Sequence, residues 1–105
     1  MDTVTAISGS GPAYIFHMIE CLVQAGQEIG LPTELAERLA IVTVSGSGQL
    51  ALKGDDSPAK LRNDVTSPGG TTEAAIAVLM ENDSLKKLVI RAVQAAANRG
   101  RALVM

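Results

Sequence analysis

Apolar side chains recur along this chain at intervals of three and four residues, the spacing that places them on one face of an α-helix. The pattern is clear between residues 10 and 30. There, Ser10 or Gly11 can cap a helix, and Pro12 lies near its first turn, where a missing N–H costs nothing. Gly30 can end this helix in the left-handed conformation. The apolar positions of this helix are Ile15, Met18, Ile19, Leu22, Gly26 and Ile29.

The same spacing, interrupted by helix-ending and helix-capping residues, predicts four further helices. Gly54 ends the second helix, Ser57 and Pro58 start a short one, and Asn82 or Asp83 caps the last. Residues 65–70 form a break, because a residue that precedes a proline is pushed toward an extended conformation. The four further helices are expected at about 34–53, 57–64, 70–81 and from 84 toward the end of the chain.

The expected fold is therefore all-α, a bundle of four longer helices and one short helix, because no alternating run of strand length stands out. The length of 105 residues fits a single domain over residues 1–105. The chain contains one Tyr, one Phe and no Trp, so small aliphatic side chains must fill its core. Several helices are apolar around much of their circumference, which is typical of helices buried on several sides. We therefore expect an interlocked homodimer.

Charge and composition exclude several classes of function. The net charge is −2, and the Lys and Arg residues are scattered, so neither nucleic acid nor an acidic membrane is an expected partner. The longest apolar stretch, residues 39–52, is interrupted by polar residues and falls short of the roughly 20 residues that span a bilayer. Asp2 and Thr3 follow Met1 where a signal peptide would carry basic residues, so the cytoplasm is the expected location.

The few metal-binding and redox-active side chains also limit the function. Cys21 is the one cysteine of the chain, which excludes an internal disulfide, and its apolar surroundings in the sequence indicate a buried free thiol. With one Cys and one His, a zinc site within a single chain is improbable, and no metal is expected. His17, Glu20 and Glu28 are interpreted as surface or packed residues of the first helix, since a lone helical His is seldom a catalytic base.

The segment Val65-Thr66-Ser67-Pro68-Gly69-Gly70-Thr71-Thr72 is the strongest candidate for a binding site. Two glycines before a helix let backbone N–H groups approach a ligand, and a helix N-terminus carries free donors and a partial positive charge. Ser67, Thr71 and Thr72 add hydroxyl groups at the same end. Such a site suits one carboxylate or phosphate. The alternative is a glycine-rich turn between helices with a Thr cap.

Two other glycine-rich segments each allow a structural and a functional interpretation. The segment Ser8 to Tyr14, S-G-S-G-P-A-Y, is either a flexible segment that ends in a helix cap or a place where backbone approaches a cofactor or substrate. It lacks the preceding strand and the spacing of a dinucleotide fingerprint. The segment Ser45-Gly46-Ser47-Gly48 lies inside the second predicted helix, where close packing of another helix could offset the cost of glycine, with a ligand loop as the weaker alternative.

The motifs at 65–72 and 8–14 together resemble those of the pyrroline-5-carboxylate reductases. V-T-S-P-G-G-T-T, followed by a helix, resembles the signature of that family, and S-G-S-G-P-A-Y resembles the start of its C-terminal helical domain. Gly30-Leu31-Pro32 and the ending A-A-A-N-R-G-R-A-L at 95–103 are also similar. The resemblance covers essentially the whole chain. It implies a fold like the C-terminal domain of 6-phosphogluconate dehydrogenase, interlocked in a homodimer that can assemble further.

The resemblance also implies an activity and a set of site residues. Enzymes of this family use NADPH or NADH, held by a Rossmann domain, to reduce 1-pyrroline-5-carboxylate to L-proline. Ser67 would donate its hydroxyl to the substrate carboxylate, the backbone N–H groups of Gly70 and Thr71 would donate too, and Thr72 would act as the catalytic residue by hydrogen-bonding the ring nitrogen. The protein supplies orientation and charge placement, while the cofactor supplies the chemistry.

The chain contains no strand–glycine-rich turn–helix unit, so we expect the Rossmann domain to be absent from it. We therefore expect residues 1–105 alone to bind no dinucleotide and to be inactive, as a truncated form of the enzyme or a solitary domain. Two other hypotheses remain. One is a purely structural helical dimerisation module, and the other is an independent enzyme that uses 65–72 as a phosphate site.

Overall fold

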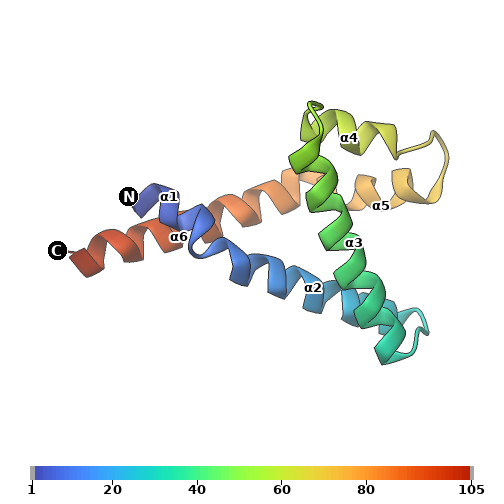
Figure 1. The fold of residues 1–105 in the computed structure, drawn as a ribbon, viewed down its shortest axis with the longest axis horizontal. Coiled ribbons are helices and arrows are strands. Elements are labelled where there is room, and N and C mark those ends of the chain that lie inside the picture. Colours follow the sequence, from blue (N-terminus) through green and yellow to red (C-terminus); the bar gives the residue numbers. More distant parts are fainter. Residues whose placement is uncertain (1, 105) are drawn as a thin grey trace. The chain divides into compact units, whose positions relative to one another are not determined.

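The computed structural model describes residues 2–104, and every regular element within them is helical. No strand occurs in this described part, so the expected all-α class is confirmed. The four longer helices and the short helix lie where the sequence predicts them, and the structure adds a short helix at the start and a 3-10 turn. The elements are α1 (Asp2–Ser8), α2 (Gly11–Glu28), α3 (Thr33–Lys53), α4 (Pro58–Asp64), α5 (Thr71–Met80), η1 (Glu81–Asp83) and α6 (Ser84–Val104) (Figure 1).

These elements form two compact units. One unit, Gly11–Ser57, contains α2 and α3. The other contains α1, α4, α5, η1 and α6, and it is described over residues 2–10 and 58–104. Each unit has its own internal packing.

The unit of α2 and α3 is a helical hairpin whose turn is set by Gly30. This glycine has φ +100°, in the left-handed region expected from the sequence. The N–H of Leu31 donates to the carbonyl of Gly26 at 2.9 Å, and the N–H of Gly30 donates to the carbonyl of Gln27 at 3.0 Å. This pair of bonds is the Schellman motif, which satisfies carbonyls that the end of a helix leaves free. The helix α2 ends at Glu28, one residue before the predicted end.

The two helices of the hairpin approach closely because small side chains face one another. A Cβ atom placed on Gly26 would lie 3.2 Å from the Cβ of Ala36 and 3.3 Å from Cδ1 of Leu31. Ala36 and Ala40 of α3 are buried at this contact. The contact therefore depends on the absence of a side chain at Gly26.

In the other unit, α1 packs on α6, and the contact is again made by alanines. Ala6 of α1 is 2% exposed and Ala97 of α6 is 9% exposed. Figure 1 shows α1, at the blue end of the chain, lying beside the orange and red α6. The helix α1 was not predicted from the sequence, in which residues 8–14 were interpreted as a flexible segment or as backbone that approaches a ligand. Its seven residues are too few for helical spacing to be recognised without the contact to α6.

The step from α5 to α6 occurs within η1. Asn82 and Asp83 both have positive φ, 54° and 55°, so two residues in the left-handed region interrupt the right-handed helix. The hydroxyl of Ser84 donates to the carbonyl of Glu81. The sequence prediction placed the start of the last helix after one of these two residues, and α6 does begin directly after Asp83.

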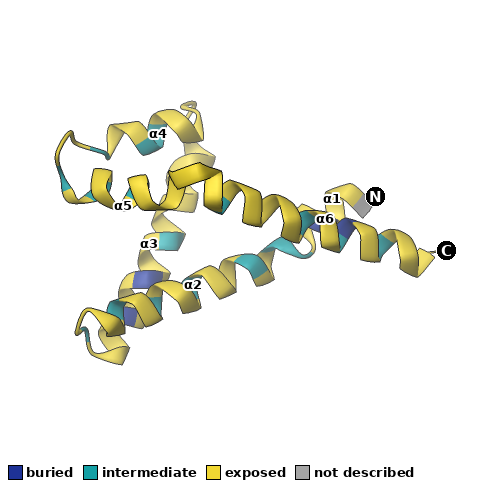
Figure 2. Cartoon of the chain, turned by 180° about the vertical axis from the view of Figure 1, so that it is seen from behind, coloured by how far each residue is buried: buried dark blue, intermediate teal, exposed yellow. Residues whose placement is uncertain are grey.

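Most large apolar side chains of the single chain are exposed. The residues classed as buried in the described part are Ala6, Ala36, Ala40 and Ala97. Phe16, Ile29 and Leu52 are 65%, 82% and 84% exposed, and Figure 2 shows exposed positions along every helix. The single chain therefore lacks a core of large side chains. None of its described helices combines the length and the apolar character needed to cross a bilayer.

Two packing contacts expected from the sequence are not made within the described single chain. The thiol of Cys21, expected to be buried, is exposed, because the face of α2 that carries it is not covered. No atom lies within 4 Å of a Cβ placed on Gly46 or Gly48, so no helix described here packs closely on those glycines. Both glycines lie within a continuous α3.

Candidate substrate-carboxylate site

The candidate site begins where the loop after α4 is fixed to the end of that helix. The backbone N–H of Thr66 donates to the carbonyl of Asn63 at 3.1 Å. The hydroxyl of Thr66 donates to the carbonyl of Arg62 at 2.6 Å, and the residue is half-buried. Thr66 thus uses both of its donors to satisfy carbonyls of the last turn of α4. These two bonds fix the direction of the backbone from the end of α4 into Ser67.

Residues 67–70 form a tight turn that leads directly into α5. The N–H of Gly70 donates to the carbonyl of Ser67 at 3.1 Å, with Pro68 and Gly69 at the two central positions. Gly69 has φ +73°, which is the conformation that a type II turn requires at its third residue. Pro68 fits the second position because its ring holds φ near −65°. The sequence S-P-G-G therefore forms this turn for local reasons.

The helix α5 starts from this turn without a capping side chain. Gly70 is the N-cap residue, in an extended conformation with φ −90° and ψ −179°, and no side-chain bond caps the helix. The first bond of the helix is from the N–H of Ala74 to the carbonyl of Gly70, at 3.3 Å. The N–H groups of the residues between them have no acceptor within the helix, as at any helix N-terminus, and they carry its partial positive charge.

The structure places all four predicted site residues at this junction. Ser67 is exposed at the start of the turn, and Gly70 is half-buried at its end. Thr71 is exposed and Thr72 is half-buried in the first turn of α5. One short segment thus holds three neutral hydroxyl groups (Ser67, Thr71 and Thr72) and the free backbone donors of a helix start. This arrangement suits a single anion of the size of a carboxylate.

Two bonds within the turn were not predicted from the sequence. The N–H of Gly70, expected to point to a ligand, is already used by the carbonyl of Ser67. The carboxylate of Glu73 accepts a bond from the N–H of Gly69 at 2.9 Å, so an anion of the chain itself lies at the glycines. A Glu at the third position of a helix often reaches back to the residues that precede it, and this capping habit could have indicated the bond.

The segment 8–14 forms a helix end and a helix start. The N–H groups of Gly9 and Ser10 both donate to the carbonyl of Thr5 at 2.9 Å, and Ser10 leads into Gly11, the first residue of α2. A Cβ atom on Gly9 would lie 2.8 Å from Cγ2 of Thr5, so the glycine is required by the preceding turn of α1. Local packing alone therefore accounts for Gly9.

The acidic residue of α4 already lies in an ion pair. The carboxylate of Asp64 accepts a bond from Nζ of Lys60 at 2.9 Å, as an exposed ion pair one turn apart on α4. Within residues 2–104, no group of three or more His, Cys, Asp or Glu side chains is arranged to hold a metal ion.

Fold and site together define a class of protein. The described helices bury only small alanines and leave large apolar side chains exposed, as in helical domains that are completed by a partner. The first 103 residues match the family model for pyrroline-5-carboxylate reductase dimerisation. The chain belongs to this family of dimerisation domains.

Relatives over nearly the whole chain carry the same assignment. A pyrroline-5-carboxylate reductase of Arabidopsis thaliana is 50% identical over 102 residues, which are 97% of this chain and 37% of that protein. One of Synechocystis sp. is 47% identical over 103 residues, 98% of this chain and 38% of the relative. This chain thus spans less than half the length of these relatives.

Solved structures have the same fold. A pyrroline-5-carboxylate reductase from Coxiella burnetii is similar with a TM-score of 0.92 and 49% identity, over 97% of this chain and 37% of that one. The pyrroline carboxylate reductase of Plasmodium falciparum, with NADP bound, is similar with a TM-score of 0.91 and 41% identity, over 97% of this chain and 41% of that one.

Proposed function

We propose that this chain is the dimerisation and substrate-carboxylate-binding domain of an NAD(P)H-dependent reductase that converts 1-pyrroline-5-carboxylate to L-proline. The observation that carries the proposal is the turn Ser67–Gly70, which leads without a side-chain cap into the N-terminus of α5. The relatives support it, because proteins of this name match the chain over 97–98% of its length. The substrate of such an enzyme carries one carboxylate beside an imine nitrogen, which matches the donors available here.

In this proposal, each of the four residues contributes a defined contact. The hydroxyl of Ser67 and the backbone N–H of Thr71 donate to the substrate carboxylate. The hydroxyl of Thr72, one residue further along α5, hydrogen-bonds the ring nitrogen. The N–H of Gly70 joins the carboxylate only if its bond to Ser67 is shared or released, so we assign it a lesser role than the sequence alone suggested. A carboxylate held by several donors is oriented as well as bound, which brings the imine carbon into a fixed position.

The hydride must come from a nicotinamide cofactor, NADPH or NADH, bound by another part of the protein. The residues described here do not fit such a cofactor, because they contain no strand and therefore no strand–glycine-rich turn–helix unit. The relative from Plasmodium falciparum was solved with NADP bound. We propose that residues 1–105 alone bind no dinucleotide and show no reductase activity. The cytoplasmic location stays a prediction.

The partner in the proposed dimer is a second copy of this chain, interlocked through the exposed apolar faces of the helices. Further assembly of dimers is compatible with this proposal. Contacts of this domain with a dinucleotide-binding domain would complete the active site.

A non-catalytic dimerisation module is the second candidate, and one observation favours it. The N–H of Gly69 is bonded to Glu73 and the N–H of Gly70 to Ser67, so the two glycines are satisfied without any ligand. In that case the turn would serve folding alone.

Titration of the isotope-labelled 105-residue chain with L-proline, followed by amide resonances, separates the two candidates. The proposal predicts saturable shifts at Thr71, Thr72 and Glu73, and none with prolinamide, which lacks the carboxylate. The same titration is repeated with the dinucleotide-binding domain added. The Ser67→Ala variant should weaken binding, whereas Ser45→Ala, an exposed serine of α3, should not. Equal responses to L-proline and prolinamide, or no response in either setting, would favour the module.

A further inference from the structure

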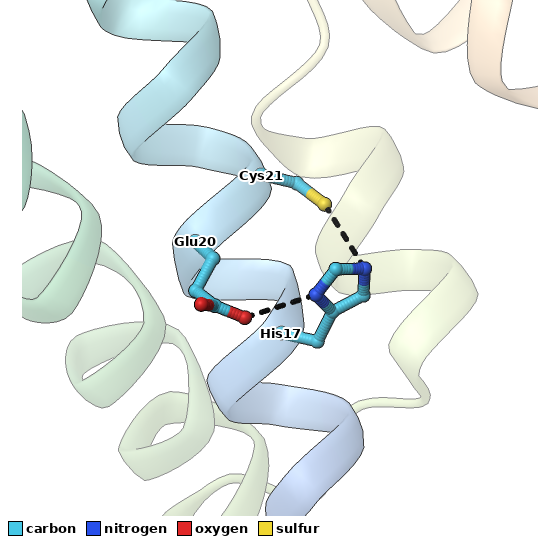
Figure 3. A network of polar contacts seen from close by, with 3 residues as sticks. All are labelled: His17, Glu20 and Cys21. Atoms are coloured by element: carbon cyan, nitrogen blue, oxygen red, sulfur yellow. Dashed lines mark hydrogen bonds and ion pairs between the residues drawn. The ribbon is translucent and has the colours of Figure 1, made fainter.

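A cluster of three side chains on α2 is unrelated to the turn at 67–70. His17, Glu20 and Cys21 lie on one face of the helix, one turn apart (Figure 3). The Nδ1 atom of His17 lies 3.0 Å from Oε1 of Glu20, and Nε2 of the same ring lies 3.7 Å from Sγ of Cys21. The side chains of His17 and Glu20 are 75% and 76% exposed, and Cys21 is exposed as well.

We propose that His17 and Cys21 are two protein ligands of a Zn²⁺ site on the exposed face of α2. Zinc binds a His nitrogen at about 2.0–2.1 Å and a Cys sulfur at about 2.3 Å, at tetrahedral angles. These values place the two ligand atoms about 3.5–3.6 Å apart. The observed separation of 3.7 Å between Nε2 and Sγ is therefore close to that of two zinc ligands.

Glu20 holds the imidazole in the form that binding requires. A neutral imidazole has one N–H and one free lone pair, and a carboxylate can only accept. The contact of 3.0 Å thus places the proton on Nδ1, where it is donated to Glu20, and leaves the free lone pair on Nε2, the ring nitrogen that lies near Cys21. Histidines that bind metals almost always donate their other N–H in this way, which raises their basicity.

Zinc binding releases the thiol proton of Cys21. The S–H bond of Cys21 breaks, the proton passes to solvent, and the sulfur forms its bond to zinc as a thiolate. Nε2 of His17 contributes its lone pair, and water fills the two remaining positions, which the exposed surface allows. The sequence alone made a zinc site within a single chain improbable, because it could not place the single His and the single Cys at this distance. A Cys–His catalytic pair is the competing interpretation, but no backbone donors of a helix start lie beside it, because both residues are in the middle of α2.

Metal binding by the reduced 105-residue chain tests the proposal. We expect one Zn²⁺ per chain by equilibrium dialysis, and a loss of affinity of at least about tenfold in both His17→Ala and Cys21→Ser. Glu20→Gln should weaken binding about tenfold, because changes to outer partners of metal ligands typically cost 10- to 100-fold. The matched control is Glu28→Gln, an exposed carboxylate at the end of the same helix, which should bind as the unmodified chain does.

Cobalt provides a direct readout of the ligands. Co²⁺ bound in place of zinc should show the thiolate-to-metal charge-transfer absorption in the near ultraviolet, and Cys21→Ser should abolish it. Helix content by circular dichroism should be the same in all variants, since the three side chains are exposed. Absence of zinc binding at micromolar concentration would overturn the proposal. Binding that survives in Cys21→Ser, or that depends on Cys21 but not on His17, would overturn it equally.

Discussion

The hydroxyl groups of Ser67 and Thr72 differ in their surroundings, and this difference separates their proposed roles. Ser67 is exposed in the turn, whereas Thr72 is half-buried in the first turn of α5. A bond to the carboxylate is the same before and during hydride transfer. A bond to the ring nitrogen changes in strength, because the charge on that nitrogen changes. Interactions that strengthen only in the transition state raise kcat.

The first prediction concerns the kinetics of these two residues in a full-length reductase that carries this domain. Ser67→Ala should mainly raise KM, and Thr72→Ala should lower kcat as well, by steady-state assay with 1-pyrroline-5-carboxylate. A hydrogen bond to a charged group is worth about 1.5–3 kcal/mol, which corresponds to a loss in kcat/KM of about 10- to 150-fold.

The control for these kinetics is Ser45→Ala, which removes an exposed hydroxyl from α3, outside the turn. If Ser67→Ala and Thr72→Ala both kept the normal kcat and KM in a folded dimer, the assignment of the site would be wrong and 65–72 would be a turn only.

The second prediction concerns the two glycines of the turn. A side chain is disfavoured at each of these positions, but for a different reason. At Gly69 the obstacle is the backbone, because φ +73° costs an L-residue roughly 1–2 kcal/mol. At Gly70 the obstacle is contact, because a Cβ atom would lie 3.2 Å from the carbonyl oxygen of Ser67. Gly69→Ala should lower the free energy of unfolding by about 1 kcal/mol, while Gly69→Asn, which tolerates this region better, should cost less.

Gly70→Val should be the most damaging change to substrate binding, because it displaces Ser67 and blocks approach to the helix start. Denaturant unfolding and KM, measured on the same variants, distinguish the two effects. Equal stability and equal KM in Gly70→Val would contradict the close packing of this turn.

At the scale of elements, local signals predicted most of the helices and their ends. Gly30 follows the end of α2, Pro58 starts α4 and Asp83 precedes α6. Each of these helix ends could be predicted because it depends on the backbone conformation of one residue and its neighbours. The helix α1 was missed because its stability comes from the contact of Ala6 with α6, nearly the whole chain away. The use of Gly70 and Glu73 within the turn was missed because it depends on the path of the loop, which composition does not determine.

The third prediction tests the close approach of α2 and α3. Gly26→Ala should destabilise the chain by about 1–3 kcal/mol despite the better helix propensity of alanine, because the added methyl would meet Ala36 at 3.2 Å. Ala25→Ser is the matched control, since it adds one atom at the exposed neighbouring position and should change stability little. A Gly26→Ala variant with a higher melting temperature than the unmodified chain would show that the hairpin is packed more loosely than described.

At the scale of the whole molecule, the exposed apolar surface is the dominant feature. The side chains buried within the described residues are four alanines, while Phe16, Ile29 and Leu52 are mostly exposed. The small, aromatic-poor core was predictable from composition. The arrangement of the dimer was not, because the pattern of apolar residues shows which faces need cover and not which faces meet.

The central claim is that this domain is completed by a second copy of itself, and analytical ultracentrifugation of the 105-residue chain tests it most directly. Interfaces that complete a core typically bury more than about 2,000 Å² in total, so the dimer should persist at micromolar concentration. We predict the sedimentation of a homodimer, with unfolding that shifts to higher denaturant as the concentration of the chain rises. A monomer that is fully helical at micromolar concentration, with unfolding independent of concentration, would contradict this account.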